Sequence, residues 1–238
     1  MPIQAPPFRS CPVDRMSADP PELPTPDHLP PDPADPHAPR FDWAKRYAED
    51  HTPWDLGGTH PGLLDWLTGA GAEVPRATVL VPGCGKGHDA VHLARMGSAV
   101  DALDIVDLVA AHFAEELAAH GGSFHVSNVL TLDPAAPDAW GGPWDLVYEH
   151  TIFCAIDLDQ RAAFGAAMAR CVRPGGHLVS FLFPVDKPRS EGGPPFAATP
   201  ADLLAALGDA FELIEDVEVT AGVPDRNWAE RRVLCRRL

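Results

Sequence analysis

A short apolar run that enters a glycine-dense turn is the feature of this sequence that most constrains its fold. Residues 78–81 are all β-branched or aliphatic, and three glycines follow at positions 83, 85 and 87. Apolar residues then recur at helical spacing as far as Met96, and Gly97 is the expected end of that helix. A strand, a glycine turn and a helix in this order present backbone N–H groups to a nucleotide-like ligand in α/β domains.

The spacing of the glycines narrows the kind of ligand. Gly83, Gly85 and Gly87 form a G-x-G-x-G turn. This differs from the G-x-G-x-x-G of dinucleotide enzymes and from the G-x-x-x-x-G-K-[ST] of phosphate-binding loops. The turn suits a ligand that lays a ribose and an amino-acid tail, rather than a phosphate, against the backbone. Gly83 and Gly85 are therefore candidate cofactor-binding residues.

Length and charge exclude several classes of function. A chain of 238 residues, 45% of them apolar, can bury one sizeable core. Its net charge of -16 argues against binding nucleic acid or an anionic membrane surface, since both need a basic face. The sequence has no run of 18 apolar residues that would predict a membrane helix, and its N-terminus lacks a secretory signal. Five scattered cysteines without a C-x-x-C pair indicate reduced thiols, so we expect a cytoplasmic protein.

Proline divides the chain into two parts. Residues 1–40 hold 13 of the 27 prolines and show almost no apolar periodicity. Such a segment lacks backbone donors and apolar surface, so we predict a disordered or polyproline-II tail. A spacer and a proline-rich ligand for a partner domain are both compatible with it. Residues 41–238 are predicted to form the folded domain.

Aromatic residues are concentrated at the start of that domain. Trp43 and Tyr47 are four residues apart, at helical spacing, and Trp54 lies in the segment 52–57 that ends the pattern. A second helix is expected over residues 61–67, with a proline in its first turn. The aromatic side chains suit either core packing or a lid over a flat or cationic ligand.

Polar residues at the ends of predicted strands are candidates for ligand contact. Asp104 ends the strand 99–104 and lies 21 positions after Gly83. A carboxylate at this position can accept hydrogen bonds from both ribose hydroxyls of a nucleoside. Asn128 follows the strand 123–127, and its amide suits either an adenine edge or an ordinary turn. Glu149 and His150 lie at the polar end of the strand 144–151, where a doubly wound sheet places its reaction centre.

The rest of the chain completes an α/β pattern. We predict further helices and strands at 107–119, 159–172, 177–184, 200–207, 211–220 and 229–236. The last two segments read as a hairpin-like antiparallel pair, which favours a methyltransferase-type sheet over a dinucleotide fold. The loop 192–196 combines glycine, proline and Phe196, which suits a mobile flap over a pocket.

Rival chemistries are weakly supported. His88 and His92 are at i and i+4, but the zinc-protease pattern needs Glu after the first histidine, and Asp89 stands there. We therefore expect no metal. No G-x-S-x-G elbow is present, which leaves an α/β-hydrolase unsupported. Cys84 lies beside a helix N-terminus, where it is either an activated thiol or a small residue that lets the backbone approach a ligand.

Five sequence blocks resemble one known family. They occur in the family's order over residues 41–198, and the last 20 residues match poorly; the blocks are 52–57, 81–89, 151–156, 173–176 and 192–196. Together they resemble the thiol/halide methyltransferase branch of the thiopurine S-methyltransferase superfamily. The resemblance implies a class I methyltransferase that uses S-adenosylmethionine, with a seven-stranded, mostly parallel, doubly wound sheet in the order 3-2-1-4-5-7-6. It also implies an N-terminal helical cover, and we expect a monomer.

The resemblance assigns roles to individual positions. It implies that the aromatic residues Trp43, Tyr47 and Trp54 close over the cofactor. It places Gly83 at the methionine part, Asp104 at the ribose hydroxyls, and Asn128 and Val129 at the adenine. His150 would contact cofactor or substrate near the methyl group, and Phe153 and Phe196 would contact the substrate. Three positions depart from the family pattern: Asn128 stands where relatives usually have Asp, and His150 and Phe196 stand where Tyr is frequent.

The implied chemistry is in-line displacement of a sulfonium methyl group by a soft nucleophile in a small molecule. A thiolate is the first acceptor to consider, with halides and thiopurines as further members of the class. A thiolate needs little help from a base, so holding two partners in line supplies most of the catalysis. His150 and Glu149 are expected to orient the substrate or accept a proton. An O- or N-methyltransferase of a small metabolite, and a non-catalytic cofactor-binding module, remain the alternatives.

Overall fold

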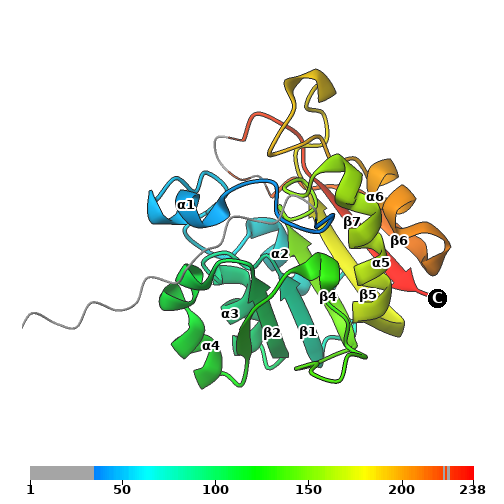
Figure 1. Ribbon diagram of the computed structural model, residues 1–238. Coiled ribbons are helices and arrows are strands. Elements are labelled where there is room, and N and C mark those ends of the chain that lie inside the picture. Colours follow the sequence, from blue (N-terminus) through cyan, green and yellow to red (C-terminus); the bar gives the residue numbers. More distant parts are fainter. Residues whose placement is uncertain (1–34, 222, 224–225) are drawn as a thin grey trace, which may run out of the picture. The chain divides into compact units, whose positions relative to one another are not determined.

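The core of the protein is one seven-stranded sheet in the order β3-β2-β1-β4-β5-β7-β6 (Figure 1). The computed structural model describes residues 35–221, 223 and 226–238. The strands are β1 Thr78–Pro82, β2 Ala99–Asp104, β3 Ser123–Val126, β4 Trp144–His150, β5 Val172–Leu182, β6 Phe211–Glu218 and β7 Arg231–Arg237. Strands β1 to β5 pair in parallel, whereas β7 is antiparallel to both β5 and β6. The predicted strand order and terminal antiparallel pair are confirmed.

Side chains of the central strands pack on both faces of the sheet. In β1, Val79 and Val81 belong to one buried cluster, whereas Leu80 between them belongs to the other. Successive side chains of a strand point to opposite faces, so a strand buried on both sides is apolar at every position. This explains why residues 78–81 contain no charged residue.

Helices cover both faces (Figure 1). The first cluster joins the sheet to α2 Pro61–Thr68, α3 His88–Arg95 and α4 Ala114–Ala119. The second joins it to α5 Arg161–Cys171 and α6 Pro200–Leu207. The remaining helix, α1 Trp43–Ala48, lies in the segment before α2. Among the described residues, no helix combines the length and hydrophobicity that a membrane crossing requires.

Two predicted elements differ most from the structure. The predicted helix 107–119 is a 3₁₀ helix, Asp107–His112, followed by α4, because Phe113 at φ -152° interrupts the helical backbone. Its ring lies against Gly87, and this packing overrides the local helical pattern. Strand β5 begins at Val172, so it includes residues 173–176, which precede the predicted strand 177–184. The pairing register with β4 shifts there, between Trp144 and Leu146.

The predicted proline-rich tail also has a different boundary. Its residues 1–34 lie outside the described part of the chain, and so do both roles considered for it, the spacer and the proline-rich ligand. Residues 35–40, which the sequence pattern assigns to the tail, pack on the domain. Ala38 is 6% exposed, and Gln160 Nε2 donates to the backbone oxygens of Pro36 and Ala38 at 2.8 and 2.9 Å. This short segment forms no helix or strand, and hydrogen bonds to its backbone carbonyls hold it on the domain.

Candidate active site

A cavity of about 370 Å³ lies at the carboxyl ends of the central strands. Gly83, Asp104, Thr151 and Phe183 each end or follow a strand, namely β1, β2, β4 and β5, and all four line it. In an open α/β sheet, ligands bind at this edge where the strand order reverses, here between β1 and β4. A smaller cavity of about 60 Å³ adjoins it over the glycine turn and shares Trp54, Gly83 and Thr151 with it.

The glycine turn has no room for side chains. Gly83 has φ +57°, and a Cβ there would lie 2.6 Å from Cδ1 of Ile152. Gly87 has φ +76° and immediately precedes α3, and a Cβ there would lie 2.1 Å from the ring of Phe113. Both positions therefore need glycine for backbone conformation and for space. The turn keeps its backbone open to the cavities.

Asp104 places a carboxylate in the wall of the main cavity. It is 6% exposed, and its oxygens accept hydrogen bonds from the backbone N–H groups of Gly85 and Val106, both at 3.1 Å. Burial raises the pKa of Asp104 to about 6, against the opposing effect of these hydrogen bonds. The carboxylate is held in position and retains lone pairs for hydroxyl donors.

The three predicted cover residues meet over the cavity. The ring of Trp54 lies edge-on to both Trp43 and Tyr47, with centroid distances of 5.4 and 5.6 Å. Trp54 Nε1 donates to the hydroxyl of Tyr47 at 3.2 Å, and all three side chains line the cavity. Phe196 does not line it. Its ring packs on Phe41, which does, with centroids 6.1 Å apart.

Ion pairs and hydrogen bonds attach this cover to the glycine turn. Asp55 accepts from Lys86 Nζ at 2.8 Å and lies 3.2 Å from Nε2 of His88. Further along, the backbone N–H of His60 donates to Asp89 at 2.8 Å. His88, one of the two histidines of the zinc-protease-like spacing, is therefore part of the link between the cover and the turn.

The amide of Asn128 is bonded within the protein. Its Nδ2 donates to the backbone oxygen of His37 at 2.7 Å, and its Oδ1 accepts from the N–H of Leu130 at 3.0 Å. The neighbouring Val129 is 5% exposed and lines the cavity. Asn128 thus holds residues 35–40 against the cavity edge, a role the sequence pattern did not indicate.

Two predicted site residues lie away from both cavities. Glu149 is 1% exposed; it accepts from the N–H groups of Ile152 and Phe153 at 3.2 and 3.3 Å and contacts the hydroxyl of Ser180. Burial raises the pKa of Glu149 to about 8, so its carboxyl group is mostly protonated at neutral pH. Phe153 is a core residue that packs on Phe164 beneath the guanidinium of Arg161.

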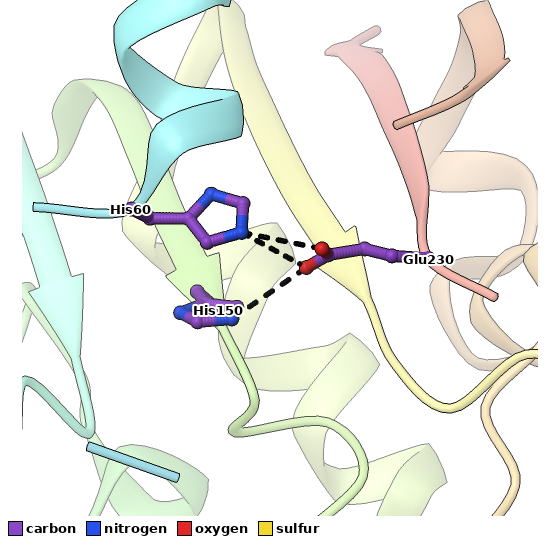
Figure 2. A group of neighbouring side chains, drawn as sticks. All are labelled: His60, His150 and Glu230. Carbon is purple, nitrogen blue, oxygen red and sulfur yellow. Dashed lines mark hydrogen bonds and ion pairs between the residues drawn. The ribbon is translucent and has the colours of Figure 1, made fainter. Parts of the chain in front are cut away.

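His150 belongs to a buried polar cluster that the sequence did not reveal (Figure 2). His60 Nε2 lies 3.1 Å from Glu230 Oε1, and His150 Nε2 lies 3.5 Å from the same atom. Arg226 Nη1 donates to Glu230 Oε1 at 2.8 Å, and Arg226 Nη2 lies 2.8 Å from His150 Nε2. His150 lines the smaller cavity and Arg226 the main one. No sequence signal links these residues, since His60 and Glu230 are 170 positions apart.

Within the described residues, His60, His150 and Glu230 are the one group whose donor atoms lie close enough to hold a metal ion, within 4.8 Å of one another. The guanidinium of Arg226 already donates to both Glu230 and His150. A divalent cation would have to displace this fixed cation from the ligands it needs. We therefore interpret the group as a hydrogen-bonded cluster.

The topology and the cavity together define a class of protein. A mostly parallel sheet that ends in the antiparallel β7, with a cavity over a glycine turn and a strand-end carboxylate, is the architecture of class I S-adenosylmethionine-dependent methyltransferases. The family model described as thiopurine S-methyltransferase (TPMT) matches residues 39–233. The chain belongs to this family and is an S-adenosylmethionine-dependent methyltransferase.

Individual relatives agree with this assignment. The chain is 32% identical over 196 residues to a probable thiol methyltransferase 2 of Arabidopsis thaliana, covering 79% of this chain and 81% of the relative. It is 30% identical, with the same coverage, to thiocyanate methyltransferase 1 of that plant. The fold resembles the crystal structure of the Burkholderia thailandensis 1,6-didemethyltoxoflavin-N1-methyltransferase with bound S-adenosylhomocysteine. That match has a TM-score of 0.59 and 19% identity and covers 81% of this chain and 84% of the other.

Proposed function

We propose that this methyltransferase transfers the methyl group of S-adenosylmethionine to a small thiol. The observation that carries the proposal is the composition of the main cavity on the two sides of the β1–β4 switch point. Asp104 and Val129, from β2 and the loop after β3, form one side. Phe183, Arg226 and Trp228, from the end of β5 and the segment before β7, form the other.

The side near Asp104 fits the nucleoside part of the cofactor. The carboxylate of Asp104 would accept hydrogen bonds from the ribose hydroxyls, and the apolar wall at Val129 would contact the adenine. Asn128 would act through residues 35–40 rather than by reading the adenine edge, because its amide already bonds His37 and Leu130.

The glycine turn and the aromatic cover fit the rest of the cofactor. Gly83 and Gly85 would leave space for the methionine part, and Trp43, Tyr47 and Trp54 would contact it from above. Aromatic faces attract a sulfonium cation, which supports this placement. When bound, the cofactor supplies an electrophilic methyl group.

The opposite side of the cavity fits a small, soft acceptor. Phe183 and Trp228 pack with ring centroids 6.2 Å apart, and the guanidinium of Arg226 lies 4.2 Å from the centroid of the Phe183 ring. Apolar surface beside the guanidinium of Arg226, which is itself paired with Glu230, suits a soft, polarisable acceptor such as a thiolate. The names of the plant relatives, a probable thiol methyltransferase and a thiocyanate methyltransferase, support the same choice. Phe196 would act indirectly, by supporting Phe41 in the cavity wall.

The net charge of -16 supports a small-molecule substrate rather than nucleic acid or an anionic membrane surface. We further propose a cytoplasmic monomer whose catalytic domain begins near residue 35.

Calorimetry and product analysis test the proposal. We expect both S-adenosylmethionine and S-adenosylhomocysteine to bind, and a panel of thiols, thiopurines and halides to yield methylated thiols by mass spectrometry. Binding without methylation of any thiol would refute the acceptor assignment. Methylation of alcohols or amines in preference to thiols would favour an O- or N-methyltransferase.

A further inference from the structure

The hydrogen bonds of His60 determine how Glu230 is held. The backbone N–H of Leu63 donates to His60 Nδ1 at 3.2 Å, so this nitrogen carries no proton. The proton of the neutral ring is then on Nε2, which donates to the carboxylate of Glu230 at 3.1 Å. His60 is completely buried and Glu230 is 6% exposed. The carboxylate is therefore fixed behind the cavity wall, with its charge directed to Arg226.

Arg226 in turn determines the protonation of His150. A guanidinium has only donors, so at 2.8 Å the Nη2 group of Arg226 must donate to His150 Nε2. A hydrogen bond from His150 to Glu230 would need a proton on that same nitrogen, and the 3.5 Å separation is longer. The two contacts exclude each other, and the shorter one prevails. The ring proton of His150 is therefore on Nδ1, on the side of the ring away from Glu230 (Figure 2).

The surroundings of His150 keep the ring neutral. Burial, together with the positive charge of the neighbouring Arg226, holds the pKa of His150 well below its usual value. His60 precedes α2, Arg226 and Glu230 precede β7, and Glu149 is the adjacent residue on β4. Across the smaller cavity lie further charged or titratable side chains that pair among themselves: Asp55 with Lys86 and His88, and Asp89 with Tyr148.

We propose that Arg226 is a positioning residue that holds His150 as a neutral hydrogen-bond donor, so that the enzyme methylates only acceptors that have ionised before they bind. The requirement for an ionised acceptor rests on the proposed thiol methyltransferase function. The assignment of the His150 proton does not.

The reaction then needs no base from the protein. The thiol loses its proton to solvent, and the thiolate sulfur uses a lone pair to form the new bond to the methyl carbon. The bond from that carbon to the sulfonium breaks, and its electron pair stays on the departing sulfur, which becomes neutral. The nearby groups Glu149 and Cys154 hold their own protons at neutral pH, since burial raises their pKa values to about 8 and about 12.

Nitrogen NMR of the histidine rings in the full-length protein tests the proton assignment directly. His150→Gln identifies the His150 signals among those of the 11 histidines. We expect a neutral ring protonated on Nδ1 that does not titrate between about pH 5.5 and 8.5. Protonation on Nε2, or a titration within that range, would overturn the proposal.

Arg226→Met provides the matched perturbation. We expect its His150 ring to titrate within that pH range or to move its proton to Nε2, toward Glu230. Arg231→Met removes a guanidinium that pairs with Asp216, outside both cavities, and should leave the His150 signals unchanged. Unchanged His150 signals in Arg226→Met would also overturn the proposal. Zinc added to the wild-type sample should not shift the His60 and His150 nitrogens, and a stoichiometric shift would establish a metal site instead.

A second measurement uses the wild-type enzyme and needs no variant to fold. With saturating cofactor, kcat/KM is measured between about pH 7 and 10 for thiols whose pKa values lie around 8.5. We expect the pH at which each kcat/KM profile changes slope to equal the pKa of the thiol used. A break at the same pH for every thiol would reveal a base on the enzyme and overturn the proposal.

The two proposals fail in different ways. If no thiol is methylated but His150 shows the expected non-titrating ring, the acceptor assignment fails and the role of Arg226 stands. If thiols are methylated with a fixed break that disappears in His150→Gln, the proposed function stands and the inference fails.

Discussion

The side-chain nitrogen of Asn128 donates a hydrogen bond to the backbone oxygen of His37, 2.7 Å away, and so joins the loop after β3 to the segment before α1. Gln160 makes the equivalent bonds to Pro36 and Ala38. Residues 37 and 39–41 line the main cavity, so these two amides complete its wall. The segment 35–41 is thus part of the candidate cofactor site.

Asn128→Asp should weaken cofactor binding. The carboxylate keeps the acceptor for Leu130 but loses the donor to His37 and places two oxygens face to face. A lost hydrogen bond with an unpaired partner costs about 1–3 kcal/mol, or roughly a five-fold or greater rise in the Kd for S-adenosylhomocysteine by calorimetry. Asn227→Asp adds a carboxylate to the same cavity at a side chain that makes no hydrogen bond to the described residues 35–40, and should change the Kd much less. If the two substitutions raise the Kd equally, the added negative charge alone explains the loss of affinity, and the hydrogen bond to His37 does not contribute.

The affinity for S-adenosylhomocysteine should fall as the pH is lowered through about 6. Burial raises the pKa of Asp104 to about 6 in the free protein, and ribose hydroxyls bind the ionised carboxylate. Binding should therefore lower this pKa and release a proton, with affinity lost by about ten-fold per pH unit below the free pKa. Calorimetry at several pH values in buffers of different ionisation enthalpy measures both effects.

Asp104→Asn is the control for that pH dependence. It should bind weakly at pH 7 and show no proton release, and the wild-type slope in this variant would point to another group. In the absence of ligand, the free energy of unfolding depends on pH with the opposite sign to the ligand affinity. The folded pKa of Asp104 is raised, so its contribution to the free energy of unfolding falls as the pH rises from about 4 to about 6.

Gly83→Ala should lose both stability and cofactor affinity. The substituted residue would pay about 1–2 kcal/mol for φ +57°, and its Cβ would lie 2.6 Å from Ile152 Cδ1 beside the cavity. Gly97→Ala is a matched control, because Gly97 has φ +95° and open space around its Cβ position. Thermal unfolding should show a cost in both variants, and calorimetry a binding defect only in Gly83→Ala. Adding Ile152→Val, which removes Cδ1, should recover part of that affinity; no recovery would exclude this contact as the cause.

Glu149→Gln should leave methyl transfer within about two-fold of wild type at pH 7. Burial raises the pKa of Glu149 to about 8, so the amide replaces a group that is already neutral. The amide oxygen can accept from Ile152 and Phe153, and its nitrogen can donate to Ser180. A loss of about 100-fold or more in kcat, in a variant that unfolds at the wild-type temperature, would identify Glu149 as a base.

Stability gives a second readout for Glu149. The raised pKa means that the wild-type protein loses stability as the pH rises from about 4.5 to 8, and Glu149→Gln should lack that dependence. Glu149→Ala, in contrast, leaves two backbone N–H groups unpaired and should destabilise the protein by about 2 kcal/mol or more at pH 7.

Local patterns predicted most of the scaffold. The strand and glycine turn at residues 78–87 and the strand that ends at Asp104 follow from short-range features: β-branched runs, glycines in turns and an acidic strand end. The helix over 107–119 was wrong in its first half, because packing at Phe113 outweighs helical periodicity. The boundary at residue 40 missed residues 35–40, which lack periodicity and are attached through their backbone carbonyls.

The site was harder to predict than the scaffold, for a physical reason. A polar residue at the end of a strand has the same sequence signal whether it faces a cavity or turns inward. Asp104 lines the cavity, whereas Glu149 turns inward to cap the loop after β4. Only the packing of neighbouring segments distinguishes the two.

The sequence by itself determined the central strands and the glycine turn, because these depend on periodicity and short-range spacing. Its five blocks determined the methyltransferase family, and the resemblance to that family implied the strand order and the place of the cofactor. Only the tertiary structure decided which hydrogen-bond partners surround His150. His60, His150, Arg226 and Glu230 come from three separate segments and meet only when the sheet has formed. Hydrogen-bond donors and acceptors are assigned by the partner each atom meets, and for His150 that partner is Arg226, 76 positions away along the chain.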